Sequence, residues 1–318
     1  MPATQLQAKE KPLAILRRRT QSTRLRAYVA LAVGILCIGF SAIFTKWADL
    51  PGSVSAFYRV LIATAALTIP YLLYVYRRRQ REKLLGIEER APRMGWALFG
   101  VTVLAGLFFA LDLVFWNTAL LVTSAANATL LGNLSTVWVS LGALVLLHES
   151  LKRRFWLGMV IAVAGTAIIV GRDVFAHPDL GWGDLLSVGS SLFYAGYLLS
   201  TNRARRRMGT MPFMWISSVA ATVILLGFVL VMGEQLTGLS ADQWWSLILL
   251  GLVSHALGWM AINYSLGHLP ASLASVTLLS QPVITALLAV PLLAEALSAY
   301  QIVGGGLVLA GIYIVNRR

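Results

Sequence analysis

The sequence lacks features on which several classes of protein depend. Its one cysteine, Cys37, excludes a disulfide within the chain and a multi-cysteine metal site. Acidic residues are scarce, with 13 against 26 basic ones, and charged residues make up 12% of the 318. Soluble domains average about 25% charged residues. An ordinary soluble domain, a disordered chain and a coiled coil are therefore excluded.

Apolar residues are abundant instead, at 58% of the chain, with a mean hydropathy of +0.75. The net charge of +13 would suit a nucleic-acid partner. The basic residues, however, fall in short runs between long apolar stretches, which is typical of a polytopic membrane protein. We therefore expect a lipid bilayer around the protein and no nucleic acid.

Ten stretches are long and apolar enough to cross a bilayer, which takes about 20 residues as a helix. The predicted spans cover residues 28–47, 54–76, 95–117, 125–147, 155–171, 183–201, 212–233, 244–267, 272–293 and 299–316. The sequence therefore predicts an all-α integral membrane protein with ten transmembrane helices.

The basic residues also predict an orientation, because Lys and Arg accumulate in cytoplasmic loops. With alternating spans, 23 basic residues fall on the side of both termini and two, Lys46 and Arg172, on the other. We expect cytoplasmic N- and C-termini and, most simply, a bacterial inner membrane. The basic residues before the first span are similar to a signal or transit peptide, but no small-residue cleavage site follows that span, so we expect an uncleaved first helix.

The two halves of the chain align when one is shifted by 146 residues. Asn117 then falls on Asn263, residues 146–151 on 292–297, Gly158 on Gly304 and Gly165 on Gly311. Each repeat holds five spans, an odd number, so the second copy is inverted in the membrane. Inverted repeats are the construction of many secondary transporters, whose substrate site lies near the midplane between the repeats.

The predicted organisation has four parts. These are a basic N-terminal segment (1–27), a first five-helix repeat (28–171), an external linker (172–182) and a second five-helix repeat (183–316).

Each repeat ends with a helix that closes on Leu-x-Glu-x-Leu and a further helix with Gly-x6-Gly. The copies are Leu147-His148-Glu149-Ser150-Leu151 with Gly158 and Gly165, and Leu293-Ala294-Glu295-Ala296-Leu297 with Gly304 and Gly311. Phe57-Tyr58-Arg59, Gly183-Asp184 and Pro282 add three further elements. Over residues 28–316 this pattern resembles the drug/metabolite transporter superfamily, in its ten-helix EamA-type branch. The resemblance implies a transport pathway among helices 1, 3, 4, 6, 8 and 9.

Several of these residues suit structural roles. Glu149 and Glu295 end the fourth and ninth helices, where a carboxylate can cap a neighbouring helix or pair with a loop arginine. The four repeated glycines form small-residue faces for close helix packing, within the chain or in a homodimer. Pro282 has Thr136 as its partner in the first repeat, so we expect the fourth helix to bend less than the ninth.

Arg59 and Asp112 are charges within predicted spans, where an unpaired charge is costly. Helix directions put both in the outer half, so we predict an ion pair. It is either a static contact or a charge in the pathway, as a gate or a proton-coupled carboxylate. His255, in the eighth span, either couples protons or hydrogen-bonds across helices as a neutral ring. Phe109 stands at its position in the first repeat.

Polar stripes on the fourth, sixth and ninth helices favour a wet cavity, because polar groups within a bilayer need partners. The pathway candidates are Asp112, Trp116, Asn133, Tyr194, Tyr197, His255, Trp259 and Gln281, although Trp116 also suits an anchor at the membrane interface.

The inverted repeat predicts a secondary active transporter, which we expect to be an exporter. The mostly neutral set of polar residues predicts a small neutral or zwitterionic substrate such as an amino acid. Protons are the expected coupling ion if there is one. A lipid flippase or a non-transporting membrane scaffold is the alternative. The sequence has no Walker-type loop, His-Glu-x-x-His or Gly-x-Ser-x-Gly motif, so we expect no enzyme, no cofactor and no metal site.

Overall fold

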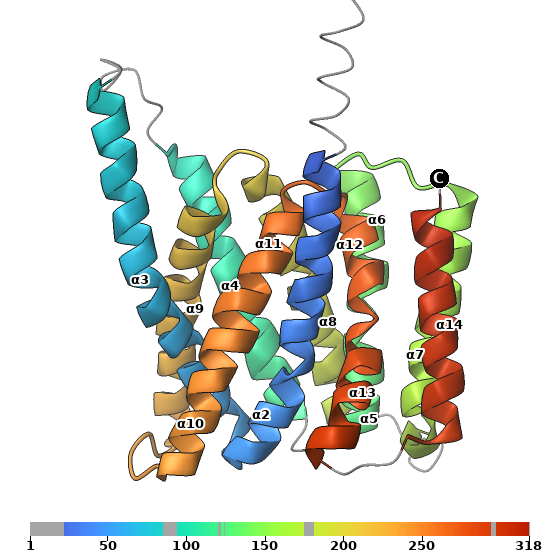
Figure 1. Ribbon diagram of the computed structural model, residues 1–318. Helices are drawn as coiled ribbons and strands as arrows, with labels where there is room; N and C mark the ends of the chain where they lie inside the picture. Colours follow the sequence, from blue (N-terminus) through green and yellow to red (C-terminus); the bar gives the residue numbers. More distant parts are fainter. Residues whose placement is uncertain are drawn as a thin grey trace, which may run out of the picture.

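The computed structural model describes residues 22–84, 94–119, 122–123, 125–174, 181–293 and 297–317. This part of the chain is helical and contains no strand. Eight stretches are long and apolar enough to cross a membrane, and α7 and α8 lie alongside them in one bundle (Figure 1). Ser22 and Arg317 lie at the same end of the bundle, here called the terminus face (Figure 1); the opposite end is the far face.

The helices follow the predicted spans. The first repeat contains the span Ser22–Ala48, which ends in α2 (Ser41–Ala48), and then α3 (Gly52–Leu84), α4 (Trp96–Ala119), α5 (Ala125–Gly132), α6 (Ser135–Leu146) and α7 (Arg153–Val174). The second contains α8 (Trp182–Arg205), α9 (Thr210–Met232), α10 (Ala241–Leu249), η1 (Leu250–Trp259), α11 (Met260–Leu266), α12 (Ala271–Leu278), α13 (Gln281–Leu293) and α14 (Ala299–Asn316).

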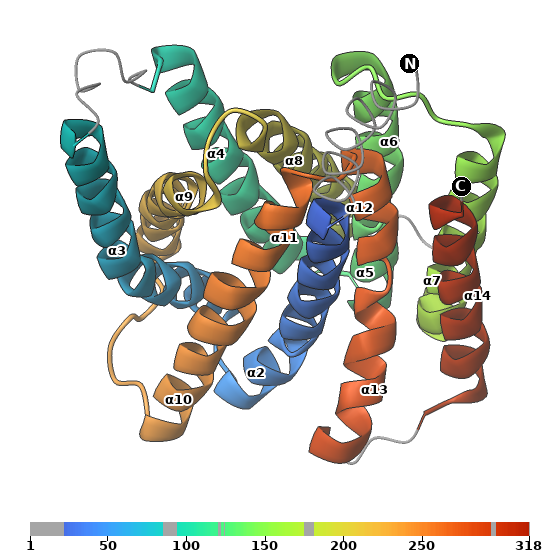
Figure 2. The same ribbon diagram turned by 45° about the horizontal axis from the view of Figure 1, so that its top comes forward.

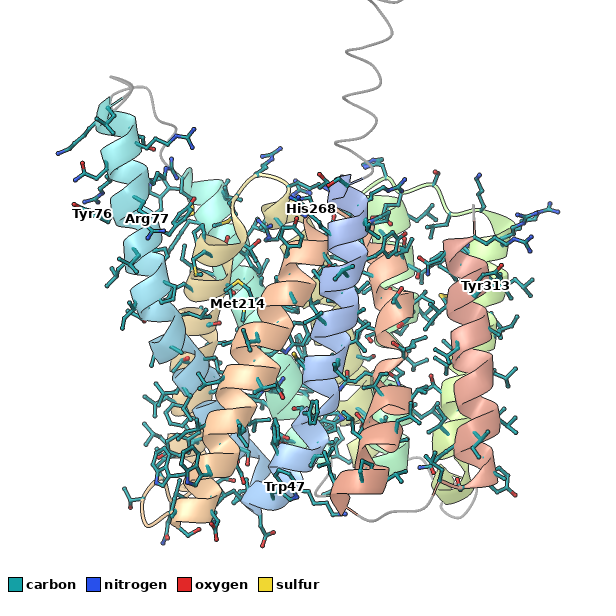
Figure 3. The ribbon with its side chains drawn as sticks, viewed as in Figure 1. Trp47, Tyr76, Arg77, Met214, His268 and Tyr313 are labelled. Carbon is teal, nitrogen blue, oxygen red and sulfur yellow. The ribbon has the colours of Figure 1, made fainter. Side chains whose placement is uncertain are left out.

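The helix α3, which contains the second predicted span (54–76), is longer than that span. It continues to Leu84 and carries a polar, basic end past Tyr76 and Arg77, which projects from the terminus face (Figure 3). Arg78 and Glu82 form an ion pair one turn apart on this extension. Polar residues can continue a helix once it has left the hydrocarbon, so hydropathy ends the span earlier than the helix.

The last helices of the two repeats, α7 and α14, pack against each other along one side of the bundle (Figure 2). A Cβ added at Gly158 would lie 2.7 Å from the carbonyl oxygen of Gly311, and one at Gly165 would lie 2.6 Å from that of Gly304. Only glycine allows the backbones to approach this closely. The repeated glycine faces therefore pack against each other within one chain.

Two spans are interrupted near their middle, at matching places in the repeats. The fourth span breaks at Asn133–Leu134, between α5 and α6, and the ninth at Leu279–Ser280, between α12 and α13. Tight i→i+3 hydrogen bonds, such as Leu134 N–H to Leu131 O at 3.1 Å, close both breaks. The fourth span therefore breaks without a proline, and the expectation that it bends less than the ninth stays a prediction.

Candidate functional site

The middle of the bundle holds two opposite charges that the sequence predicted to pair. Asp112 on α4 accepts a hydrogen bond from Ser190 Oγ on α8 at 2.6 Å. Arg59 on α3 interacts electrostatically with Asp112. Both side chains are described and partly exposed, yet no nitrogen of Arg59 lies within 4.0 Å of an oxygen of Asp112 among the described contacts. Among the described residues, the predicted direct ion pair is therefore absent, and the two charges interact over a longer distance.

Close helix approach positions Arg59. A Cβ on Gly251 of η1 would lie 2.7 Å from Ile62 Cγ2 and 3.2 Å from the carbonyl oxygen of Arg59. Glycine at this place brings η1 against the first turns of α3. The backbone around Arg59 is thereby fixed by packing rather than by the charge itself.

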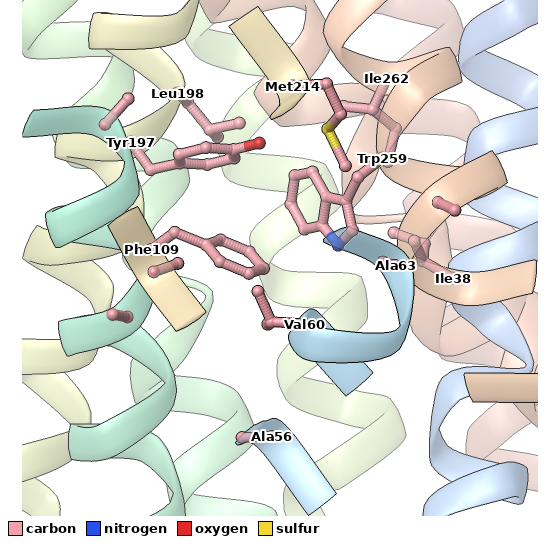
Figure 4. Close-up of a cluster of buried hydrophobic side chains, with 14 of the residues drawn as sticks. Ile38, Ala56, Val60, Ala63, Phe109, Tyr197, Leu198, Met214, Trp259 and Ile262 are labelled. Carbon is pink, nitrogen blue, oxygen red and sulfur yellow. The ribbon is translucent and has the colours of Figure 1, made fainter. Parts of the chain in front are cut away.

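An aromatic layer, part of which is drawn in Figure 4 with Phe109, Tyr197 and Trp259 labelled, interacts electrostatically with Arg59 through Tyr197 and His255. The ring of Phe109 lies 4.9 Å from Tyr197, 5.1 Å from Trp259 and 5.3 Å from His255, measured between ring centres. Tyr197 and Trp259 lie 5.2 Å apart in an edge-to-face arrangement. All four side chains are at most 5% exposed. Such contacts stabilise a well-packed closure between helices of both repeats.

Helix direction places this layer on one side of the charges. The helix α4 runs from the terminus face to the far face, so Phe109 lies nearer the terminus face than Asp112 (Figure 1). The helix α8 runs the opposite way, so Tyr197 also lies nearer that face than Ser190. The aromatic layer therefore separates the charged pair from the terminus face.

A buried polar network lies beyond the layer, towards the terminus face. Tyr197 donates to Asn263 Oδ1 at 3.0 Å, and Arg205 Nε donates to the carbonyl oxygen of Asn263 at 3.0 Å. Asn202 donates to the carbonyl oxygens of Leu266 and Leu269. These bonds tie the end of α8 to α11 and the loop that follows it.

Sequence reasoning missed this network. It counted Arg205 among the loop arginines 203, 205, 206 and 207, whereas the Arg205 side chain is only 7% exposed. The four residues cannot be told apart without knowing which direction the last turn of α8 faces. The polar pair Thr201 and Asn202, both fully buried, was the only available signal.

Three buried polar atoms at or beside the aromatic layer have no hydrogen-bond partner in the described structure. They are Arg59 Nε, His255 Nδ1 and Trp259 Nε1. Buried polar atoms are nearly always hydrogen-bonded. Other such atoms lie elsewhere in the bundle, for example Asn133 Nδ2 at the break between α5 and α6 and Asn316 Oδ1 on α14.

The eighth span is wound as a π-helix over Leu250–Trp259, which includes His255 and Trp259. Insertions of π-helix frequently mark functional sites. His255 Nε2 lies 3.4 Å from Ser218 Oγ, and the ring is 2% exposed. The sequence predicted a continuous α-helix here, since no residue pattern distinguishes the two kinds of winding.

The structure thus brings five of the eight pathway candidates together. Tyr194 lies 6.0 Å from Trp259 and interacts electrostatically with Arg59 and Asp112. The five candidates are Asp112, Tyr194, Tyr197, His255 and Trp259, and four of them lie around the pair of Arg59 and Asp112. Asn133 lies at the break between α5 and α6.

The other two candidates show no contact with the cluster. Trp116 has its nearest described approach to Gly132, where an added Cβ would lie 4.0 Å from Trp116 Cδ1. Gln281 begins α13, and the described hydrogen bonds do not involve its side chain.

Glu149 caps a helix of the other repeat. Its carboxylate accepts hydrogen bonds from the backbone N–H of Ala271 at 2.8 Å and from the N–H and hydroxyl of Ser272, at the start of α12. Arg206 Nη2 lies 3.9 Å away. A carboxylate is favourable at a helix N-terminus, where unpaired N–H groups carry partial positive charge. Glu295 lies outside the described residues.

The fold and site define a class of protein. Two five-helix halves in opposite orientation meet at glycine-packed helices, and both carry broken helices beside a buried cluster of polar and charged residues. Inverted repeats of this kind are the construction of many transporters.

The comparisons with known proteins agree. The EamA-like transporter family matches residues 25–171 and 181–317, so the chain belongs to this family. It is 25% identical to an uncharacterized transporter of Archaeoglobus fulgidus over 92% of this chain and 98% of the relative. It is 25% identical to a probable terminal-alkyne amino-acid exporter of Streptantibioticus cattleyicolor, over 61% of this chain and 65% of the relative.

A solved structure titled only as a crystal structure of a protein shares the fold. It superposes with a TM-score of 0.71 over 92% of this chain and 98% of that chain, at 18% identity. The protein is therefore a multi-pass membrane transporter of the EamA-like family.

Proposed function

We propose that the protein is a secondary active exporter of a small zwitterionic or neutral metabolite, with an amino acid as the first class to test. The observation that carries this proposal is the pair Arg59 and Asp112, opposite charges inside the bundle that interact electrostatically without a direct ion pair. An α-amino acid carries the complementary charges: its carboxylate suits a guanidinium and its ammonium suits a carboxylate.

The neighbouring groups support a small organic substrate. Tyr194, Tyr197 and Trp259 offer aromatic surface for a side chain and for a cation. A phosphorylated substrate would call for several buried basic residues, and Arg59 is the cation within this cluster. The name of the S. cattleyicolor relative, a probable terminal-alkyne amino-acid exporter, points to the same substrate class.

The proposed mechanism is alternating access between the two repeats. The aromatic layer and the network of Asn202, Arg205 and Asn263 would close the path towards the terminus face, while the charged pair lies on the far side of the layer. Transport requires this closure to open and a second one to form. With cytoplasmic termini in a bacterial inner membrane, the substrate would enter from the terminus face.

Protons are the proposed coupling ion. Asp112 can bind a proton in competition with a substrate ammonium, and His255 lies against the same aromatic layer. Substrate and proton would then exchange at one site, which is the requirement for antiport.

Counterflow in proteoliposomes tests the proposal. Vesicles are preloaded with pools of unlabelled amino acids or other metabolites, and uptake of the labelled counterparts is recorded with and without a pH gradient. Saturable counterflow for an amino-acid pool supports the proposal. Counterflow only for lipids would favour a flippase, and no flux with any pool from folded protein would favour a scaffold.

A further inference from the structure

A large groove lies outside the central site, at the terminus face between the first span, α12–α13 and α14. Its volume is about 1380 Å³, above the roughly 300–1,000 Å³ of small-molecule pockets. We propose that this groove binds one anionic phospholipid, with the phosphate at a basic rim and an acyl chain along an apolar wall. The lipid is a bound ligand in this proposal, not the transported substrate.

The rim is basic and its cations are uncompensated. Its five cations come from three segments: the first span, the start of α7 and the residue after α14. They are Arg24, Lys152, Arg153, Arg154 and Arg317. The described ion pairs involve none of them. The acidic residue of the lining, Glu149, already caps α12. Basic pockets between transmembrane helices are typical sites for anionic lipid headgroups.

The walls below the rim are mainly apolar, with Thr277 and Ser280 as polar members, and have the depth of one lipid leaflet. Ile35 follows Arg24 by eleven residues, about 16 Å along a helix, and Leu309 precedes Arg317 by eight, about 12 Å. Half of the hydrocarbon core of a bilayer is about 15 Å thick. An acyl chain that hangs from a phosphate at the rim would therefore run along these walls.

The groove also opens sideways to the bilayer. Leu309 and Tyr313 on α14 line it and are 53% and 64% exposed, and Tyr313 points outward near the terminus face (Figure 3). The last helix α14 packs closely on α7 and only lightly on α12 and α13. A lipid can thus enter laterally without unfolding any helix.

A second copy of the chain is a poorer occupant. A two-fold dimer presents the same surface from both subunits, so five cations would face five cations. The chain before Ser22 is also basic, with Lys9, Lys11 and residues 17–19 against Glu10. Charge complementarity therefore selects an anion from the membrane.

The test measures lipid binding to the full-length protein in a neutral detergent. Phosphatidylglycerol and phosphatidylcholine with the same acyl chains are titrated, and binding is read by native mass spectrometry and by the shift in Tm. We expect phosphatidylglycerol to bind at least tenfold more tightly than phosphatidylcholine. Glycerol phosphate, the headgroup without chains, is expected to give no shift at the same concentrations.

The decisive variant is K152Q/R153Q/R154Q, in which all three altered side chains are exposed. We expect at least tenfold weaker binding of phosphatidylglycerol. The matched control, R77Q/R79Q/R81Q on the exposed end of α3, removes the same charge from the same face and should stay within twofold. Equal losses in both variants would show general surface attraction and overturn the proposal.

The apolar wall has its own pair of variants. Leu309→Glu, in the groove, should weaken phosphatidylglycerol binding at least fivefold, whereas Val303→Glu, exposed on α14 outside the groove, should not. Unchanged binding in Leu309→Glu, or a shift with glycerol phosphate equal to that with the lipid, would mean a site for soluble anions and would overturn the proposal. A protein that is a dimer without lipid and a monomer at saturating lipid would show that a second copy of the chain occupies the groove instead.

Discussion

The contact between α7 and α14 and the cluster around Asp112 are built in opposite ways. The first uses residues that both repeats share: Gly158 and Gly304, Gly165 and Gly311. The second uses positions where the repeats differ. In the same 146-residue frame His255 replaces Phe109, Trp259 replaces Leu113, and Gly258 stands where the first repeat has Asp112.

This difference separates architecture from chemistry. An inverted duplication makes symmetric contacts automatically, because each helix meets the copy of itself, and such contacts favour packing. A substrate that is not symmetric needs different groups on its two sides. The divergent positions therefore form the better guide to the substrate. Phe109 and His255, which occupy equivalent positions, lie 5.3 Å apart and show where the two halves meet.

The largest effect is expected at the symmetric contact. Gly165→Leu adds a side chain whose Cβ alone would lie 2.6 Å from the Gly304 carbonyl oxygen and 2.7 Å from the Val308 nitrogen. Backbone atoms cannot move aside, so we expect loss of most folded protein, beyond the usual cost of overpacking of about 1–3 kcal/mol. Size-exclusion chromatography of detergent extracts measures the yield.

Gly306→Leu is the control for this variant, because Gly306 lies on α14, the helix that α7 packs against, and nothing lies within 4 Å of a Cβ built there. Its yield should match that of the wild type. Normal yield of Gly165→Leu would mean that α7 and α14 are not closely packed.

The charged pair should come next, with an effect on transport and not on folding. Asp112→Asn and Arg59→Gln each remove one charge from the proposed site and should lower counterflow at least 100-fold, with Tm changed by only a few degrees. If both charges hold one substrate, the double variant should be no worse than the poorer single variant. Losses that multiply would argue for separate roles.

Asp242→Asn provides the matched control, since Asp242 is an exposed acid near the start of α10. Its counterflow should stay within twofold of the wild type.

The buried network beyond the aromatic layer should give an intermediate effect. Arg205→Gln breaks hydrogen bonds to the carbonyl oxygens of Asn263 and Met208. Hydrogen bonds of charged groups contribute about 1.5–3 kcal/mol, so we expect a stability loss of that order, measured by thermal unfolding in detergent. Arg203→Gln, two residues earlier and exposed, should change Tm by less than about 1 °C, by the small cost of surface substitutions.

The smallest effect is expected at Pro282. It is the second residue of α13, where the missing N–H has no partner in a helix anyway. The matching break in the fourth span forms with Thr136 and no proline. Pro282→Ala should therefore leave Tm within about 2 °C, in line with the effect of neutral surface changes, and counterflow within threefold. A large loss of counterflow would show that the two breaks are not equivalent.

Much of the fold was predictable because hydropathy is a local property. Each span needs about 20 apolar residues whatever its neighbours are, and the repeat is read from spacing alone. The glycine faces were also predictable, although not their partner. Sequence left open whether they pack within the chain or in a dimer, and the contact between Gly158 and Gly311 is internal.

The site was predicted in part. Charged residues within spans are rare enough to be noticed, which singled out Asp112. Tyr197 was noticed on the polar stripe of the sixth helix, and Trp259 as an aromatic wall candidate for the pathway. Ser190, which donates to Asp112, was one serine among several on a polar stripe. The rotation of each helix about its axis decides which of these serines faces the carboxylate, and rotation depends on packing against other helices.

The sequence by itself determined the ten spans, the inverted repeat and the family resemblance, since these depend on composition and spacing along the chain. Only the tertiary structure decided that Arg59 and Asp112 interact without a direct ion pair, that Arg205 is buried, and that basic residues from the first span, α7 and α14 surround one groove. The physical reason is that each of these arrangements joins helices that are separated along the chain, whose distance and rotation are fixed by packing.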